Sequence, residues 1–235
     1  MVRKVILITG ASSGIGLEYA KYLSKKNFIL VLCARRKKLL IKNFKNCKNV
    51  FYDKVDVTKE SEIKKFVKSV VKKYKRIDIL INNAGIAKKQ KFNNLSINYL
   101  TNAFQVNLIS YFLFIRECLP LMKKNKFGRI VNISSGGSIN CASDYSVYSA
   151  TKAGVNTIAK SFNNEVSQAY NIKINSISPG PCKTKMFPEN PLSPKKSIPT
   201  LEKLISSSPK TPTGEFYYFM KKKIVIPNIK FVLKK

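Results

Sequence analysis

A continuous apolar run over residues 5–9 leads directly into the glycine-rich segment TGASSGIG, residues 9–16. Apolar residues then recur at helical spacing over residues 17–26. Gly10 permits a tight turn, Gly14 lets the backbone approach a pyrophosphate, and Gly16 lets the helix pack closely on the strand. The free N–H groups at the start of the helix would face the phosphates. A glycine pattern alone is weak evidence, but one between a strand and a helix predicts a nucleotide-binding turn.

Short apolar runs alternate with helical patterns as far as residue 177. Buried parallel strands are continuous apolar runs because both of their faces are covered. The alternation predicts the fold class α/β, a Rossmann-like doubly wound parallel sheet of six to seven strands with helices on both faces. The predicted strands are 5–9, 28–34, 49–55, 77–81, 130–133 and 172–177, and the predicted helices are 17–26, 59–74, 98–122 and 147–168.

Two arginines, Arg35 and Arg36, follow the second predicted strand. In a dinucleotide-binding fold an acidic residue at this point holds the ribose 2′-hydroxyl, whereas a basic residue accommodates a 2′-phosphate. Arginine is rare in this lysine-rich chain, and its planar guanidinium suits phosphate. The pair therefore predicts NADP(H) in preference to NAD(H), and the alternative is a solvated basic turn.

The segment SSGGSINCASDYSVYSATK, residues 134–152, contains the candidate catalytic groups. Tyr148 and Lys152 are four residues apart on a predicted helix, so they share one face. An ammonium beside a phenol favours the phenolate, and we expect Lys152 to lower the pKa of Tyr148. Ser135 follows the end of a strand, where open α/β sheets place their chemistry. The chain has no His, which leaves a tuned Tyr as the strongest acid–base candidate. The alternative for a Tyr and Lys at this spacing is an ordinary solvated helix turn.

Two further polar features stand in apolar surroundings. Asn82-Asn83-Ala84-Gly85 follows the fourth strand, and its small residues leave room for a flat ring system. Asn107 lies in the long predicted helix 98–122, where it is either functional or a satisfied core amide. Pro120 is expected to bend or end that helix.

At 235 residues the chain is predicted to form a single domain, 1–235. The regular alternation stops after residue 182, and residues 183–213 are rich in Pro, Ser and Lys, as in a mobile loop or substrate lid with a short helix at 201–205. Residues 214–235 form a short C-terminal segment, with a helical turn expected at 216–220 and a strand at 224–226.

Composition limits the other classes of function. The chain has five scattered Cys without a CxxC pair, and it has no His. This argues against a zinc site, so we expect no metal. Scattered Cys also fit a reducing compartment, so we expect a cytoplasmic location. No apolar stretch has the length of a signal core or a transmembrane segment. The net charge of +32 would suit an anionic partner. We interpret it as compositional, since the lysines are spread along the whole chain, and expect no specific nucleic acid partner.

Taken together, the motifs resemble those of the short-chain dehydrogenase/reductase family. The resemblance covers roughly residues 3–186, with every motif in the order of the family. The motifs are TGASSGIG at 9–16, Asp56-Val57, Asn82-Asn83-Ala84-Gly85, Asn107, Ser135, Tyr148-Ser149-Ala150-Thr151-Lys152, and Pro179-Gly180 with Thr184. Members of the family commonly continue further beyond this region, so the lid and the oligomer interface are the parts that the resemblance describes least.

The resemblance implies an oxidoreductase that transfers hydride between a nicotinamide and a carbonyl or alcohol. Tyr148 would be the proton donor in reduction and the acceptor in oxidation. Lys152 would lower the pKa of Tyr148 and hold the nicotinamide ribose. Ser135 would hydrogen-bond the substrate oxygen, and Asn107 would hold a water that relays protons to Lys152.

The resemblance also implies where the cofactor binds. Ser12 and Arg35, helped by Arg36, would contact the 2′-phosphate, the glycine turn the pyrophosphate and ribose, and the segment after residue 178 the nicotinamide amide. The implied cofactor-binding residues are Gly10, Ser12, Ser13, Gly14, Ile15, Gly16, Arg35, Arg36, Asp56, Val57, Asn83, Ala84, Gly85, Tyr148, Lys152, Pro179, Gly180 and Thr184.

Three functions remain open at this point. The first is an NADP(H)-dependent oxidoreductase that acts on a small-molecule carbonyl or alcohol substrate, as a homo-oligomer (dimer or tetramer). The second is a 3-oxoacyl-carrier-protein reductase, whose acidic carrier would suit the basic surface. The third is of a different class, a catalytically decayed protein that binds a dinucleotide or RNA.

Overall fold

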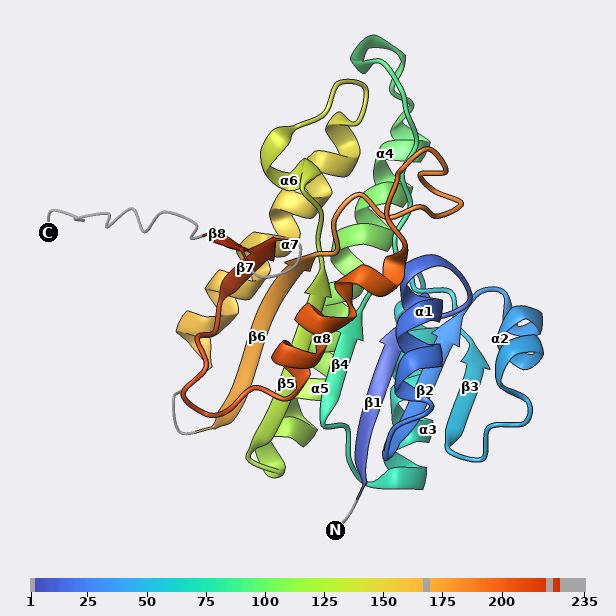
Figure 1. Cartoon of the computed structure of the whole chain (residues 1–235), viewed down its shortest axis with the longest axis vertical. Coiled ribbons are helices and arrows are strands. Elements are labelled where there is room, and N and C mark those ends of the chain that lie inside the picture. The colour runs from blue at the N-terminus through green and yellow to red at the C-terminus, as the bar shows by residue number, and fades with distance from the viewer. Residues whose placement is uncertain (1–2, 167–169, 219–221, 225–235) are drawn as a thin grey trace, which may run out of the picture.

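The computed structural model describes residues 3–166, 170–218 and 222–224. Its strands form one sheet with the order β3-β2-β1-β4-β5-β6-β7-β8 (Figure 1). The first seven strands are parallel, and β8 pairs antiparallel with β7. The strands are β1 (Lys4–Thr9), β2 (Phe28–Ala34), β3 (Val50–Lys54), β4 (Ile79–Asn82), β5 (Phe127–Ile133), β6 (Asn171–Ser178), β7 (Glu215–Tyr218) and β8 (Lys222–Ile224).

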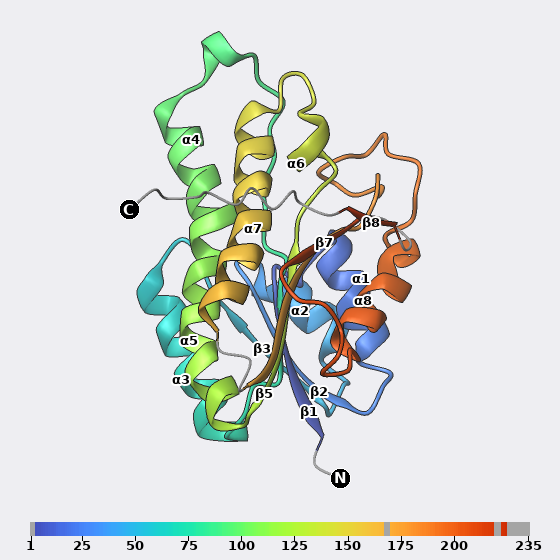
Figure 2. The same ribbon diagram turned by 90° about the vertical axis from the view of Figure 1, so that its left-hand side faces the viewer.

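Helices cover both faces of the sheet. Figure 2 shows α3, α5 and α7 on one side of it and α1, α2 and α8 on the other. The helices are α1 (Gly14–Leu23), α2 (Lys37–Phe44), α3 (Glu60–Tyr74), α4 (Ile97–Phe104), α5 (Ser110–Lys124), α6 (Gly137–Asn140), α7 (Ser146–Glu165) and α8 (Ile198–Ile205), with the 3-10 turns η1 (Phe92–Asn94) and η3 (Pro194–Ser197) and the π-helical turn η2 (Gln105–Ile109).

The pattern of burial in β1 shows why its apolar run is continuous. Val5 and Leu7 point into the core beneath α3, α5 and α7, whereas Ile6 and Ile8 point into the core beneath α1, α2 and α8. All four side chains are almost fully buried. A strand that is covered on both faces cannot alternate apolar and polar residues. The doubly wound parallel sheet predicted from the sequence is therefore confirmed.

The sheet order places a topological switch at its centre. From β1 the chain adds β2 and β3 on one side, and β4, β5 and β6 on the other. The two sets of connections leave a crevice beyond the carboxyl ends of β1 and β4, where open α/β sheets bind their ligands. The motifs of the sequence all lie at or near this edge.

The predicted helix 98–122 differs from the observed structure. Two α-helices, α4 and α5, flank the π-helical turn η2, so the hydrogen-bond ladder is interrupted around Asn107. Such interruptions occur frequently at functional sites. Pro120 does not end the helix, because α5 continues past it to Lys124. Pro120 lies on the exposed face, where water can satisfy the carbonyl that loses its partner.

The C-terminal region differs most from prediction. The helical turn expected at 216–220 is wrong for its described part, because Glu215–Tyr218 forms β7, parallel to β6. Of the strand expected at 224–226, residue 224 ends β8, and residues 219–221 and 225–235 lie outside the described residues, as does the predicted end of helix 147–168. Phe216 and Tyr217 are buried, so burial against β6 outweighs local helical preference.

The segment 183–213, predicted as one lid, divides into two parts. Its second part contains α8, whose Leu201, Leu204 and Ile205 are buried against the sheet beside α1. Its first part, residues 183–193, stays at the carboxyl edge, and only this part of the segment borders the crevice. No helix in the described residues is long and apolar enough to span a membrane.

Candidate active site

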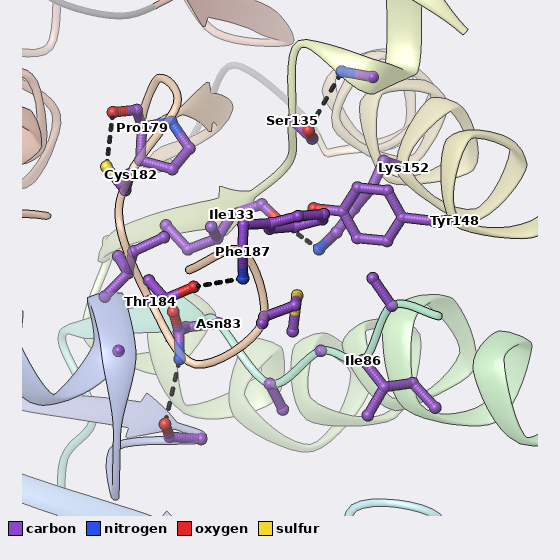
Figure 3. A pocket seen from close by; sticks show the side chains of 18 of the residues that line it. Asn83, Ile86, Ile133, Ser135, Tyr148, Lys152, Pro179, Cys182, Thr184 and Phe187 are labelled. Carbon is purple, nitrogen blue, oxygen red and sulfur yellow. Dashed lines mark hydrogen bonds between the residues drawn. The ribbon is translucent and has the colours of Figure 1, made fainter. Parts of the chain in front are cut away.

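A cavity of about 1120 Å³ opens at the carboxyl edge of the sheet. It extends from the glycine turn after β1 to the start of α7, and it is roofed by the loop that follows β6 (Figure 3). Its volume is above the roughly 300–1,000 Å³ that is typical of sites for small ligands. The predicted residues that line it are Gly10, Ser12, Ser13, Gly14, Ile15, Arg35, Arg36, Val57, Asn83, Ala84, Gly85, Ser135, Tyr148, Lys152, Pro179, Gly180 and Thr184.

The glycine turn is as tight as the sequence predicts. Gly10 and Gly14 have φ values of +66° and +58°, which residues with a side chain rarely adopt. A Cβ atom at Gly16 would lie 2.3 Å from Nδ2 of Asn83 and 2.9 Å from the carbonyl oxygen of Gly10. Gly16 does not line the cavity, and its role is to let α1 approach the ends of β1 and β4.

Asn83 holds this turn in place. Its Nδ2 donates to the carbonyl oxygens of Thr9 at 2.9 Å and Gly10 at 3.2 Å. In return, the hydroxyl of Thr9 accepts from the backbone N–H groups of Asn83 and Ala84. The side chain of Asn83 is thus used to join β4 to the turn, and the backbone that follows it faces the cavity.

The two arginines have different surroundings. Nη2 of Arg36 donates to the hydroxyls of Ser13 at 2.6 Å and Ser12 at 3.4 Å, so its guanidinium lies across the glycine turn. Arg35 lies nearer to Asp56. Burial opposes the ionisation of Asp56, but hydrogen bonds from Thr58 and the charge of Arg35 together lower its pKa. Asp56 does not line the cavity, whereas Val57 beside it does.

Tyr148 lies at the other end of the cavity, in the first turn of α7. Its side chain is buried. Burial raises the pKa of Tyr148, and a hydrogen bond with Ser135 offsets part of that rise. The hydroxyl of Ser135 also accepts from the backbone N–H of Gly137 at 3.1 Å, which fixes its position just beyond β5. Ser135 and Tyr148 can therefore contact one bound atom together.

Lys152 is one turn further along α7, and its side chain is almost fully buried at the wall of the cavity. Its Nζ donates to the carbonyl oxygen of Ile133 at 2.6 Å, as Figure 3 shows, and to the hydroxyl of Tyr111 at 3.3 Å. Burial lowers the pKa of Lys152 to about 7. The sequence led us to expect a lowered pKa for Tyr148, and this is wrong for the protein alone. Burial affects both groups, and Nζ is directed at Ile133 and Tyr111.

Asn107 lies in η2, and its side chain links this turn to α7 and to the loop after β4. Its Nδ2 donates to the carbonyl oxygen of Ile86 at 2.9 Å and to the hydroxyl of Thr151 at 3.1 Å, and its Oδ1 accepts from the N–H of Ile86 at 2.8 Å. The side chain is fully buried and does not line the cavity. Both amide hydrogens of Asn107 are therefore occupied by groups of the protein.

The loop after β6 closes the cavity over the glycine turn. Gly180 has a φ of +84°, and the thiol of Cys182 donates to the carbonyl oxygen of Pro179 at 3.2 Å. Thr184 accepts at its hydroxyl from the N–H of Phe187 at 3.2 Å, which leaves the hydroxyl hydrogen free to donate into the cavity. A Cβ atom on Gly14 would lie 3.5 Å from Thr184, so the loop and the turn nearly touch.

Several lining residues were not predicted. The rings of Tyr145 and Phe187 pack beside Tyr148 and build an aromatic wall, with centroids 5.6 to 6.5 Å apart. Tyr218 of β7 reaches the same space beside Gly136. The spacing of Tyr145 and Tyr148 on one helix turn was the available signal. No local pattern predicts that Phe187 or Tyr218 lines the cavity, because Phe187 lies in a loop and Tyr218 in a strand that was not predicted.

The fold is a doubly wound α/β sheet, and its cavity runs from the glycine turn after β1 to Ser135, Tyr148 and Lys152. The family model described as short chain dehydrogenase matches residues 4–194. The chain belongs to this family, and the resemblance seen in the sequence is confirmed.

Similar proteins include the uncharacterized oxidoreductase YxjF of Bacillus subtilis, which is 32% identical over 139 residues, or 57% of this chain and 54% of the relative. The 3-oxoacyl-[acyl-carrier-protein] reductase FabG of Buchnera aphidicola is 36% identical over 137 residues, or 57% of this chain and 55% of the relative. The chain thus matches about half the length of these curated relatives.

Solved structures match over more of the chain. A variant of actinorhodin polyketide ketoreductase with NADPH has a TM-score of 0.86 at 26% identity, and covers 92% of this chain and 95% of its own. The 3-ketoacyl-(acyl-carrier-protein) reductase of Brucella melitensis complexed with NADH has a TM-score of 0.86 at 25% identity, and covers 93% of this chain and 96% of its own.

Proposed function

We propose that the protein is an NADP(H)-dependent oxidoreductase that interconverts a carbonyl compound and its alcohol. One observation carries the proposal. A single cavity joins a phosphate-type end, built from Arg36 and the glycine turn, to an acid–base end, built from Ser135, Tyr148 and Lys152.

The cavity fits the proposed cofactor in both shape and chemistry. The positive end of α1, a helix of ten residues, lies at the glycine turn, where a phosphate gains from the helix dipole. Gly10 and Gly14, at two positions of the turn that line the cavity, have no side chain that would keep a phosphate away. Arg36, Ser12 and Ser13 add a cation and two hydroxyls at the same end. The other end is enclosed by apolar and aromatic groups, as a flat ring requires.

When bound, the nicotinamide supplies or accepts the hydride of the reaction. In reduction, Tyr148 gives its phenolic proton to the substrate oxygen while the carbonyl carbon gains the hydride, so a carbonyl becomes an alcohol. Ser135 donates a hydrogen bond to the same oxygen as its negative charge develops. The aromatic wall of Tyr145 and Phe187 limits the access of water to these groups.

Lys152 restores the proton that Tyr148 loses. Its ammonium stabilises the phenolate, and a pKa near 7 lets it release or take up a proton at neutral pH. The raised pKa of Tyr148 keeps the phenol protonated before the reaction. Tyr148 is therefore in the protonated form that carbonyl reduction requires. The ribose hydroxyls of the cofactor would lie against Nζ, at the hydrogen that Ile133 and Tyr111 leave free.

Arg36 is the residue that we expect to decide the preference for NADP(H). Replacing Arg36 by Ala removes a guanidinium that is already held over the turn, and a charge-assisted hydrogen bond contributes about 1.5–3 kcal/mol, or about 10- to 100-fold in affinity. We expect NADPH to bind about 10- to 100-fold more weakly, with little change for NADH, in fluorescence titrations. Arg35→Ala should have a smaller effect.

A matched control is Arg116→Ala, which removes the same charge from the surface of α5, where Arg116 pairs with Glu60 and Glu117. This control corrects for the loss of general attraction by a chain of net charge +32. Equal losses of NADPH affinity in Arg36→Ala and Arg116→Ala would refute a specific role for Arg36.

A 3-oxoacyl-carrier-protein reductase is the narrower candidate. Two of the similar proteins carry names of this kind, and an acidic carrier would suit a basic chain. Turnover of acyl-carrier substrates that falls steeply when surface lysines are neutralised, with turnover of small ketones unchanged, would favour this candidate over a reductase of small carbonyl compounds.

A further inference from the structure

A second tyrosine, Tyr111, contacts the lysine of the site. Tyr111 belongs to α5 and is fully buried. Its hydroxyl lies 3.3 Å from Nζ of Lys152 and donates to the carbonyl oxygen of Ile133 at 3.2 Å. Nζ donates to the same carbonyl at 2.6 Å. Three polar atoms from α5, α7 and the end of β5 thus form a closed triangle.

The direction of each hydrogen bond follows from this triangle. The hydroxyl hydrogen of Tyr111 is directed to Ile133, so its lone pairs face the ammonium and accept from it. Burial raises the pKa of Tyr111 well above its ordinary value, so this hydroxyl stays neutral. Tyr111 is therefore a fixed dipole beside Lys152, with no proton to lend.

Packing accounts for the ring of Tyr111 but not for its hydroxyl. The ring belongs to the apolar core around Phe114 and Ile130, where a Phe would fit as well. The hydroxyl has Lys152 and Ile133 as its hydrogen-bond partners. A buried hydroxyl without partners costs free energy, so a Tyr at this position needs those two groups.

The other groups that face Nζ are few. Tyr148 lies on the same helix, with its ring centroid 5.8 Å from Nζ, and the backbone of Gly85 approaches from the loop after β4. The buried amide of Asn107 is directed to Ile86 and Thr151. Among the described residues no carboxylate forms an ion pair with Lys152. The ammonium therefore depends on neutral acceptors for its stabilisation.

We propose that Tyr111 is a positioning residue, whose hydroxyl holds Nζ of Lys152 against the carbonyl of Ile133 and keeps the ammonium form available to Tyr148. The contact itself is independent of any ligand, and its use in catalysis rests on the proposed function. Without the hydroxyl, Nζ would keep one protein acceptor instead of two, and the neutral amine would be favoured.

The test is a titration of Lys152 by NMR. Protein labelled with ¹³C at the lysine Cε carbons is titrated from about pH 5.5 to 9, a range in which ordinary lysines do not titrate. The signal that titrates near pH 7 and is absent from Lys152→Met belongs to Lys152. In Tyr111→Phe we expect its midpoint to fall by about one pH unit, because the charged form loses an acceptor.

The matched control is Tyr19→Phe, which removes the hydroxyl of another fully buried tyrosine, bonded to Ser197 on the opposite face of the sheet. It should leave the midpoint unchanged. With a carbonyl that the wild type reduces, Tyr111→Phe should lower kcat about tenfold, with the KM for NADPH within threefold of wild type. A merely structural role would move neither the midpoint nor this split.

The outcomes separate this inference from the proposed function. A shifted midpoint in a protein that binds no NADPH supports the contact and refutes the function. An unshifted midpoint in a folded Tyr111→Phe protein that binds and oxidises NADPH overturns the role of Tyr111 alone. A wild type with no lysine titrating between about pH 5.5 and 9 also overturns it, since the triangle requires an enclosed Nζ.

Discussion

Tyr148→Phe should lower kcat for carbonyl reduction by about 10³-fold, since a positioned acid contributes roughly 10²–10⁴-fold. The substitution keeps the ring that packs against Tyr145 and Phe187 and removes only the hydroxyl that faces Ser135. The chain has no His that could take the place of Tyr148 as the acid. Loss of NADPH absorbance with a carbonyl substrate measures the effect.

Binding distinguishes a lost proton donor from a damaged site. We expect the dissociation constant for NADPH to stay within threefold of wild type in Tyr148→Phe, because the phosphate end of the cavity is untouched. Tyr19→Phe, which loses a buried hydroxyl that does not line the cavity, should keep full activity. A Tyr148→Phe protein with more than a tenth of wild-type kcat would show that another group delivers the proton.

Gly16→Ala should abolish measurable NADPH binding, an expected loss of more than about 100-fold. The new Cβ would lie 2.3 Å from Nδ2 of Asn83 and 2.9 Å from the carbonyl of Gly10, both too close. Asn83 cannot simply move aside, because its amide holds Thr9 and Gly10. Breaking those two hydrogen bonds costs about 1–3 kcal/mol of stability and opens the turn that the phosphates would meet.

Nucleotide fluorescence and thermal unfolding together measure this second effect. The matched control is Gly154→Ala on α7, where a Cβ would meet methyl groups of Leu108 at 3.0 Å, and a side chain can move where a tied turn cannot. Gly154→Ala should therefore bind NADPH as wild type does. Normal binding by Gly16→Ala would show that the turn does not need its present geometry.

Local patterns account for the parts of the structure that the sequence predicted. The apolar runs that became β1 and β2 are buried on both faces, so their positions follow from the local order of residues. The glycine turn was predictable because positive φ and close approach both require glycine. Tyr148 and Lys152 share a helix face, so their proximity needed only the helical period.

Contacts between distant segments account for what the sequence missed. β7 forms because it pairs with β6, and α8 is buried because it packs beside α1. The residues of β7 and α8 themselves carry no signal for either contact. Arg36 crosses to Ser13 from the next strand, so its orientation depends on the turn between them. Burial lowers the pKa of Lys152 to about 7, and that burial depends on segments that are distant in the chain. Spacing predicts which groups meet but not the surroundings that tune them.

The test that bears most directly on a working dinucleotide site is an equilibrium titration of the wild-type protein with NADPH and NADH. It is best followed by nucleotide fluorescence at about 0.5 M salt, where the Debye length is about 4 Å and the attraction of a highly basic chain is screened. We predict saturation at one NADPH per chain, at least tenfold tighter than NADH. Binding that salt abolishes for both nucleotides, with RNA bound and released in the same way, would contradict the account and favour a decayed, non-catalytic protein.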